Sequence, residues 1–458
     1  MAGINIAIER MTQQKALTSI AAAYFYAALL VAGPWIFTIL GIAGLSSTGC
    51  TTACDDLTLF RSVVIYNSLF ALVVTSPLAF FSGRCVSDQL YAGVTRGAYF
   101  VFAAALGVFL LVVCATAVPF YLFAAEMDAS VRFAAIQNAV LIGLSWLLIP
   151  FLGVIRAHLS LLVAFGINAL LMIVLGRMLS EPSAGTLLGA FNASFAITDV
   201  ILVGTLVRTF STRVEVQWTL FRFPPEKWEL PLAGFAYAVG IWADKVIMWY
   251  GAESGGLSVA GVLRTMPSYD TAMFWAQLTS IPVIAVAFVH VETQMSDLFG
   301  RFYGRLDQQA SLRELSEVMQ SLRTCVISSV ATLFVALAIV ATMTILLSFV
   351  FMTEFGLRPA YMSILRISLW AMAFHTSSMF CFVFLLYFDL RRQALLIVST
   401  YAILNTALTL LILQWGQVYY GYGSLIAASA TFVLAFSILL RELPWLHYHA
   451  FITNNTSL

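Results

Sequence analysis

Six ionisable side chains lie within, or at the edge of, stretches of the chain that are otherwise apolar. They comprise three carboxylates, an ammonium, a guanidinium and an imidazole, namely Asp199, Asp244, Lys245, Asp270, Arg366 and His375. A charge at the centre of a bilayer costs about 2.5–3.5 kcal/mol on insertion scales, so such groups usually meet water, a partner or a substrate. We expect these six side chains to line a hydrated path that binds charged groups reversibly. The alternative interpretation is that they form ion pairs that hold one conformation.

Two of the six residues, Asp244 and Lys245, are neighbours in the sequence. Successive positions on a helix point about 100° apart. We therefore expect that the two side chains do not simply neutralise each other, and that each faces a different part of its surroundings.

Three further ionisable residues lie closer to the ends of apolar stretches and are weaker candidates for the same path. These are Arg61, Arg264 and Glu292. A long arginine side chain can reach the membrane interface from such a position, so the two arginines need no functional role.

The elements that must position these residues are long apolar segments. Of the 458 residues, 61% are hydrophobic and only 10% are charged, whereas soluble domains have about 45–50% apolar and ~25% charged residues. A helix needs about 20 apolar residues to cross a bilayer, and helices satisfy their own backbone hydrogen bonds there. The sequence predicts an all-α polytopic membrane protein with twelve transmembrane helices, near residues 18–45, 58–82, 98–122, 132–154, 160–179, 186–207, 231–251, 271–292, 325–352, 361–388, 393–415 and 424–440.

Gly33 and Pro34 lie within the first of these segments. Proline inside a helix frees a backbone carbonyl and permits bending. The pair therefore predicts a hinge, and a merely tolerated kink is the alternative.

The distribution of Lys and Arg predicts the orientation of the chain. Basic residues gather in every second connection, with four between Arg208 and Lys227 and four between Arg301 and Arg323. The opposite connections are short and often acidic, as in Phe123–Ser130. Basic connections face the cytoplasm, so we expect a multi-pass protein with both termini cytoplasmic.

The two halves of the chain resemble each other in order. A boundary falls in the proline-containing segment 221–230, which separates a predicted N-terminal lobe, 1–220, from a C-terminal lobe, 231–458. Six helices in each half make the repeat parallel, with its axis along the membrane normal. Two such lobes around a midplane cavity predict alternating access, and chance similarity between apolar segments is the alternative. The matched elements are Gly33-Pro34-Trp35 with Gly240-Ile241-Trp242, Tyr66-Asn67 with Tyr269-Asp270, and Asn168 with Asn405.

One cytoplasmic segment, 307–323, has apolar residues at helical spacing and charges on its other faces. This pattern predicts an amphipathic helix. Three interpretations stay open: a helix on the membrane surface, a docking site for a cytoplasmic partner, or a solvated connector.

Motifs for enzymatic chemistry are missing from the sequence. None of the three lysines follows glycine, so there is no phosphate-binding G-x-x-x-x-G-K-[ST] loop. No predicted cytoplasmic connection exceeds roughly 35 residues, too few for an independent domain. Nothing suggests a cofactor, a metal or nucleic acid, and we expect no enzyme. Cys50 and Cys54 share a predicted outward loop, where a disulfide and two free thiols are both compatible with the sequence.

At this point the residues support a family resemblance over nearly the whole chain. The chain resembles the PelG family of Pel exopolysaccharide exporters in four motifs. These are Gly33-Pro34-Trp35 within residues 27–40, Trp242-Ala243-Asp244-Lys245, Met266-Pro267-Ser268-Tyr269-Asp270 and Val291-Glu292-Thr293. The resemblance implies the multidrug/oligosaccharidyl-lipid/polysaccharide flippase superfamily, with twelve helices in two six-helix lobes. It also implies a bacterial inner-membrane location and export of the cationic, N-acetylgalactosamine-rich Pel polymer to the biofilm matrix.

The same resemblance implies partners and a mechanism. The partners are the cytoplasmic Pel glycosyltransferase, together with cyclic-di-GMP-sensing and scaffolding inner-membrane Pel proteins. We expect the polymer to pass between the lobes, with Asp199, Asp244 and Asp270 as acidic contacts and with Lys245 and Arg366 setting the local field. These contacts should be weak, because a chain must leave as well as enter. The energy source stays open, as do two alternatives, a multidrug or cation antiporter and a non-transporting scaffold for the glycosyltransferase.

Overall fold

The structure is a computed structural model that is almost entirely helical over the residues it describes. These are residues 17–46, 54–91, 97–155, 157–179, 182–210, 227–251, 256–308, 311–348, 350 and 359–446. Residues 47–53, which include Cys50, most of the linker 221–230 and both chain ends lie outside them, so the pairing of Cys50 with Cys54 stays untested.

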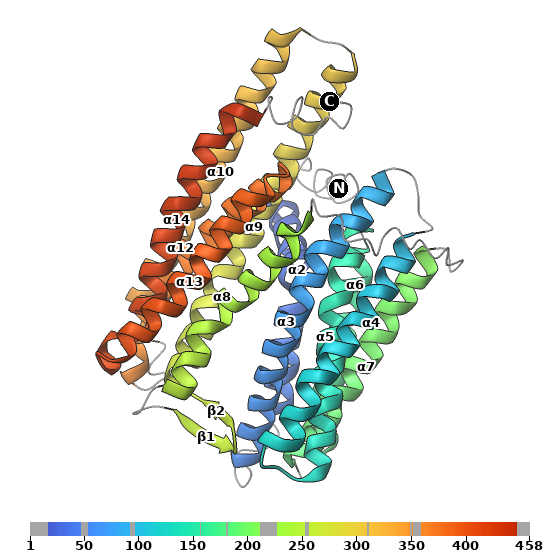
Figure 1. The fold of residues 1–458 in the computed structure, drawn as a ribbon, viewed down its shortest axis with the longest axis vertical. Helices are drawn as coiled ribbons and strands as arrows, with labels where there is room; N and C mark the ends of the chain where they lie inside the picture. Colours follow the sequence, from blue (N-terminus) through green and yellow to red (C-terminus); the bar gives the residue numbers. More distant parts are fainter. Residues whose placement is uncertain are drawn as a thin grey trace. The chain divides into compact units, whose positions relative to one another are not determined.

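Long apolar helices follow one another along the chain (Figure 1). Two short strands and three short helical turns complete the described elements. The long helices are α2 (Leu17–Ser46), α3 (Cys54–Tyr91), α4 (Ala98–Pro119), α5 (Ala129–Val154), α6 (His158–Met178), α7 (Ala184–Thr209), α8 (Glu229–Gly251), α9 (Pro267–Asp307), α10 (Leu312–Leu346), α12 (Pro359–Tyr387), α13 (Arg391–Leu413) and α14 (Tyr422–Glu442). The short ones are η1 (Phe120–Ala124), η4 (Gln417–Tyr419) and η5 (Leu443–Trp445).

The predicted class, an all-helical polytopic membrane protein, is confirmed. Within the described residues, 11 helices are long and apolar enough to cross a membrane. The first predicted segment coincides with α2, whose described apolar part, Ala32–Ser46, is shorter than a span. The total of twelve transmembrane helices therefore stays a prediction.

Contacts divide the chain into two compact units. One comprises Ala32–Met266, and the other comprises Met1–Val31 together with Pro267–Leu458. The first unit therefore contains α8, which packs against α3. The lobe boundary at 221–230 rests on the sequence repeat, and it stays a prediction.

Close helix packing in the Ala32–Met266 unit depends on small residues, as is common between membrane helices. A Cβ atom on Gly234 of α8 would lie 2.5 Å from the Ser76 carbonyl oxygen of α3. The contact of Gly234 is with backbone, which cannot rotate away as a side chain could. A Cβ atom on Gly41 of α2 would lie 2.5 Å from the Met172 Sδ and 3.3 Å from the Ala169 Cα, both of α6.

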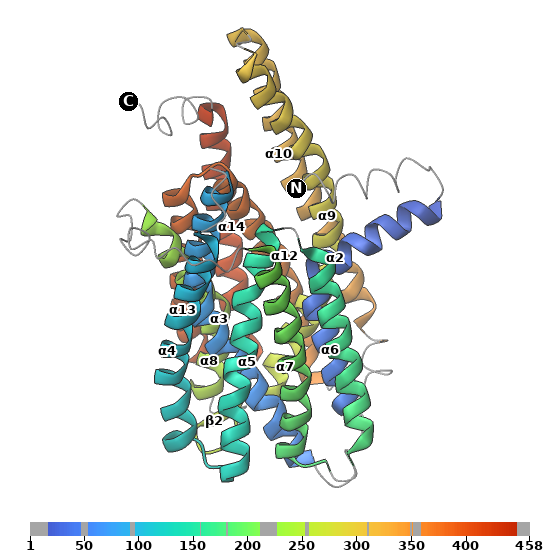
Figure 2. The same cartoon turned by 90° about the vertical axis from the view of Figure 1, so that its right-hand side faces the viewer.

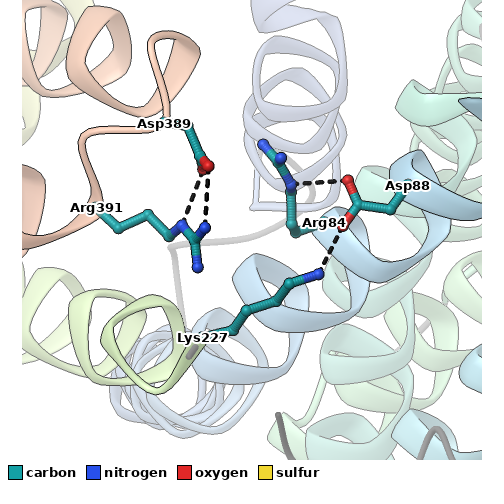
Figure 3. A network of polar contacts seen from close by, with 5 residues as sticks. All are labelled: Arg84, Asp88, Lys227, Asp389 and Arg391. Atoms are coloured by element: carbon teal, nitrogen blue, oxygen red, sulfur yellow. Dashed lines mark hydrogen bonds and ion pairs between the residues drawn. The ribbon is translucent and has the colours of Figure 1, made fainter. Parts of the chain in front are cut away.

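In the other unit, α12 packs against α9, α10, α13 and α14. Phe334 of α10 stacks on Phe432 of α14 with ring centroids 5.1 Å apart. The turn from α12 to α13 places Asp389 at a φ of 59°, a left-handed conformation that is uncommon outside glycine and asparagine-like residues. The Arg391 guanidinium donates two hydrogen bonds of 2.9 Å each to the Asp389 carboxylate (Figure 3).

Two membrane helices continue well past the predicted spans. The 41 residues of α9 would extend about 60 Å at 1.5 Å per residue, twice the hydrocarbon thickness. The paired ends of α9 and α10 extend beyond the ends of α12 and α14 in both views (Figures 1 and 2). Phe302 of α9 forms a buried cluster there with Leu315 and Val318 of α10. Apolar positions of the amphipathic segment 307–323 therefore pack on α9, and its residues from Leu312 onward form the beginning of α10.

A small β-hairpin precedes α9. Strands β1 (Leu257–Ala260) and β2 (Leu263–Thr265) pair antiparallel, with Leu257 opposite Thr265. Gly261 turns the chain with a φ of 58°, which glycine adopts without steric cost. The sequence did not predict this element.

Buried polar contacts and candidate path residues

Asp199 lies on α7 with 4% of its surface exposed. The Ser145 hydroxyl of α5 donates a hydrogen bond of 2.6 Å to its Oδ1. The other oxygen, Oδ2, is buried without a hydrogen-bond partner among the described residues. The carboxylate therefore has acceptor capacity left over in the interior of a helix bundle.

Asp244 and Lys245 meet on α8, contrary to the expectation from their adjacent positions. Lys245 Nζ lies 3.4 Å from Asp244 Oδ1, and it donates a hydrogen bond of 2.9 Å to the Ile241 carbonyl. Helical side chains lean toward the N-terminus, so the long lysine folds back along α8 and brings its ammonium beside the carboxylate. The ammonium also lies 5.8 Å from the centroid of the Trp242 ring.

Both partners of this pair are largely shielded. The Asp244 side chain is 3% exposed and the Lys245 side chain 14%. An ion pair so shielded is costly to form unless other groups support it. Here the Ile241 carbonyl and the electron-rich ring of Trp242 provide part of that support.

An uncharged chain of hydrogen bonds crosses the same unit. The Tyr121 hydroxyl donates to Asn67 Oδ1 at 2.7 Å, and Asn67 Nδ2 donates to Asn138 Oδ1 at 2.8 Å. Asn138 Nδ2 then donates to Asn192 Oδ1 at 2.7 Å. The four residues are at most 2% exposed and link η1, α3, α5 and α7. Sequence reasoning missed this network because it searched the spans for charges alone, although Asn67 had appeared in the repeat.

The π-helix η1 supplies the first donor of that network. It follows Pro119 directly and carries Phe120 and Tyr121. The Tyr121 hydroxyl reaches Asn67, and the Phe120 ring lies 5.8 Å from the Tyr66 ring of α3. Single π-helical turns are frequent at functional sites.

The remaining three candidates belong to the other unit. His375 of α12 is 8% exposed, and its ring centroid lies 4.4 Å from that of Tyr401 on α13. Arg366 is exposed on the same helix, and Asp270 is half-buried in the first turn of α9. Asp199, Asp244 and Lys245 lie in the Ala32–Met266 unit. A path lined by all six residues therefore stays a prediction.

The weaker candidates fall in dissimilar places. Arg61 of α3 and Arg264 of β2 are exposed. Glu292 lies on α9, but its side chain is outside the described part of the structure. Gly33 is buried on α2, where a Cβ atom would meet Leu162 of α6.

Pro34 lies close to the point at which α2 passes from one compact unit to the other. The units divide between Val31 and Ala32. The Pro34 carbonyl accepts a hydrogen bond of 2.7 Å from the Thr38 hydroxyl. The hinge at Gly33 and Pro34 remains a prediction, and the two residues lie next to the boundary between the units.

An ion-pair cluster fastens the beginning of α8 to the end of α3. Figure 3 shows Arg84 and Lys227 on two sides of the Asp88 carboxylate. Arg84 Nε lies 2.9 Å from Asp88 Oδ1, and Lys227 Nζ lies 2.6 Å from Oδ2. Lys227 lies within the predicted linker, 221–230, so this part of the linker is anchored to α3.

Within the described residues, no group of three or more His, Cys, Asp or Glu side chains is placed to hold a metal ion. The polar groups gathered here can accept and donate hydrogen bonds and can pair with charges.

Comparison with known families assigns the chain to one family of exporters. The sequence model of the PelG family, described as an exopolysaccharide exporter (EPS-E), matches residues 1–451. A search of curated proteins finds no match.

Solved structures of similar fold are membrane transporters. A structure of MATE in complex with MaL6 has 13% identity and a TM-score of 0.62, with 97% of each chain covered. A MOP superfamily transporter from Pyrococcus furiosus Vc1 has 13% identity and a TM-score of 0.61, again with 97% of each chain covered. An inward-facing multidrug resistance MATE family transporter has 14% identity and a TM-score of 0.57, covering 92% of this chain and 99% of that one. Identities this low establish the shared fold alone.

Proposed function

Because the chain belongs to the PelG family of exopolysaccharide exporters, we propose that it moves the Pel polymer, a cationic polysaccharide rich in N-acetylgalactosamine, from the cytoplasm to the periplasm. The observation that carries this proposal is the family match over residues 1–451. A multi-pass membrane protein with the MATE fold is suited to the task, since that fold is found in transporters.

The buried carboxylates support cationic polymer as the substrate. Asp199 Oδ2 has no partner among the described residues, and Asp244 is held beside Lys245 at a contact of 3.4 Å. An ammonium on an amino sugar can compete with Lys245 for Asp244, and it leaves when Lys245 returns. Such exchange gives the weak, repeated binding that a moving chain requires. Asp270, Arg366 and His375 complete the proposed path from the other unit.

The proposal includes a cellular context. The chain works in the bacterial inner membrane with both termini in the cytoplasm, where the cytoplasmic Pel glycosyltransferase delivers the polymer. Cyclic-di-GMP-sensing and scaffolding inner-membrane Pel proteins complete the complex. The distribution of basic residues supports the orientation, and co-purification of the glycosyltransferase with this chain tests the partnership.

Asp244→Asn is the direct test of the path. We expect secreted polymer to fall several-fold at an unchanged level of membrane-inserted protein. Asp297→Asn is the matched control, because Asp297 is an exposed carboxylate that pairs with Arg301 near the far end of α9. Equal secretion by the wild type and both variants would remove Asp244 from the path.

A multidrug or cation antiporter is the second candidate function, and the fold shared with multidrug transporters favours it. This alternative predicts drug resistance in cells that contain no Pel partner. The scaffold alternative predicts that the glycosyltransferase leaves the membrane when this chain is lost, while path variants secrete normally.

A further inference from the structure

Tyr66 of α3 makes an unusual set of contacts with a segment almost 200 residues further along the chain. Its hydroxyl donates a hydrogen bond of 2.9 Å to the Arg264 carbonyl and accepts one of 3.0 Å from the Arg264 backbone N–H. One hydroxyl therefore satisfies both backbone groups of a single residue in β2. The same hydroxyl lies 3.1 Å from the Tyr250 hydroxyl.

The ring of Tyr66 is as firmly held as its hydroxyl. Trp249 of α8 stacks on it with centroids 4.9 Å apart, and Phe120 of η1 stacks at 5.8 Å. Tyr66 is 4% exposed and Trp249 is 1% exposed. Stacking of this kind leaves the hydroxyl little freedom to move away from Arg264.

Two more contacts fasten the turn of the hairpin. Tyr250 donates a hydrogen bond of 2.8 Å to the Val262 carbonyl, and the Val262 N–H donates one of 3.3 Å to the Ala124 carbonyl. A Cβ atom on Gly261 would lie 2.8 Å from the Ala124 oxygen. The hairpin is thus attached to α3, to α8 and to the end of η1, all in one compact unit.

The position of the hairpin in the chain gives these contacts a consequence. Strand β2 ends at Thr265, Met266 is the last residue of the Ala32–Met266 unit, and Pro267 begins both α9 and the Pro267–Leu458 part of the other unit. A single residue therefore separates a strand anchored in the Ala32–Met266 unit from α9, which belongs to the other unit.

We propose that Tyr66 is a positioning residue that makes the β1–β2 hairpin a rigid tether, so that the chain leaves the Ala32–Met266 unit toward α9 at a fixed point of that unit. An isolated two-stranded hairpin is marginally stable in water, so its order depends on these attachments. With a flexible linker in place of the hairpin, the point at which the chain leaves the Ala32–Met266 unit would vary by several ångströms. The tether fixes the point at which the chain leaves the Ala32–Met266 unit, and its role in export rests on the proposed function.

Hydrogen–deuterium exchange on the purified full-length protein tests the tether without any substrate. Tyr66→Phe removes the hydroxyl and keeps the stacked ring. Losing the hydrogen bonds to Arg264 should raise exchange at residues 257–265 about ten-fold, since such bonds contribute about 0.5–1.5 kcal/mol each and about 1.4 kcal/mol corresponds to a factor of ten. Tyr250→Phe should give a smaller rise, and Tyr99→Phe on α4 is the control with no expected change. Unaltered exchange in Tyr66→Phe, or an equal rise throughout α3 and α5, would overturn the proposal.

The link to export is tested by restoring the attachment in another way. Tyr66→Phe should lower secreted polymer several-fold. A cysteine pair at Ala124 and Val262, whose backbones already share a hydrogen bond, should recover secretion in the oxidised state and lose it again under reductant. If Tyr66→Phe raises exchange at residues 257–265 while secretion stays normal, the tether has no role in export. If Tyr66→Phe and Asp244→Asn both secrete normally while Tyr66→Phe exchanges faster, the proposed path and the export role both fail, and the tether itself stands.

Discussion

Ser145 of α5 and Asp199 of α7 are joined by a hydrogen bond of 2.6 Å in the interior of the helix bundle. Ser145 is 2% exposed and Asp199 is 4% exposed. Removing one partner of a buried hydrogen bond to a carboxylate leaves the other without compensation, which typically costs about 1–3 kcal/mol.

We therefore expect Ser145→Ala to destabilise the protein by roughly 1–3 kcal/mol, as measured by thermal unfolding in detergent. Ser194→Ala is the matched control, because that buried hydroxyl donates only within its own helix, to the Ala190 carbonyl. A Ser145 variant no less stable than the Ser194 variant would show that the Asp199 carboxylate does not depend on Ser145.

The asparagine network should be sensitive at its centre. Asn138→Leu keeps the approximate shape but leaves Asn67 Nδ2 and Asn192 Oδ1 with fewer partners. We expect a loss of about 2–6 kcal/mol, which is the sum for two buried groups that each lose a partner at about 1–3 kcal/mol. Gln137→Leu is the control, because its only described contact with Asn192 is 3.5 Å long. Similar stabilities for the two variants would argue against the network as a stabilising feature.

Gly234 should not tolerate even one added methyl group. A Cβ atom would lie 2.5 Å from the Ser76 oxygen and 2.8 Å from the Pro77 nitrogen. Gly234→Ala should therefore push α8 from α3 and cost roughly 1–3 kcal/mol. Gly189→Ala on α7 meets open space and should be neutral or slightly stabilising, because alanine favours helix. Equal effects of both substitutions on the unfolding temperature would contradict this packing.

Pro34→Ala tests the predicted hinge in α2. Alanine restores a backbone donor and straightens a helix, so we expect unfolding temperature to stay level or rise while secreted polymer falls several-fold. Pro150→Ala, near the end of α5, is the control for a proline away from the unit boundary. Normal secretion by Pro34→Ala would show that Pro34 causes only a tolerated kink and does not act as a hinge.

The sequence predicted the helices well because the thickness of the membrane sets the length of the apolar segment that must cross it. An apolar stretch of about 20 residues is a direct consequence of bilayer thickness, and each predicted segment overlaps a helix of the structure. The long extension of α9 was missed for the same reason, because hydropathy stops at the membrane surface whereas the helix continues to the Phe302 cluster. The start of α10 was predicted as an amphipathic helix from its own helical spacing, and Ser311 and Glu314 cap it reciprocally.

The polar contacts were less predictable because each depends on residues far apart in the sequence. Tyr66 and Arg264 meet only once α3 and the hairpin are folded together. Asp244 and Lys245 were expected to face apart, and only the course of the lysine side chain shows that they pair. Charge made Asp199 conspicuous in the sequence, whereas Asn138 and Asn192 carried no such signal.

The central claim, polysaccharide export, is tested most directly by measuring polymer on both sides of the membrane in a producing strain that lacks this chain. The glycosyltransferase level and its membrane attachment should be measured in the same cells. We predict that secreted polymer is lost while polymer accumulates in the cytoplasm and the enzyme stays in place. Undiminished secretion would contradict export, and loss of polymer on both sides with release of the enzyme would indicate a scaffold.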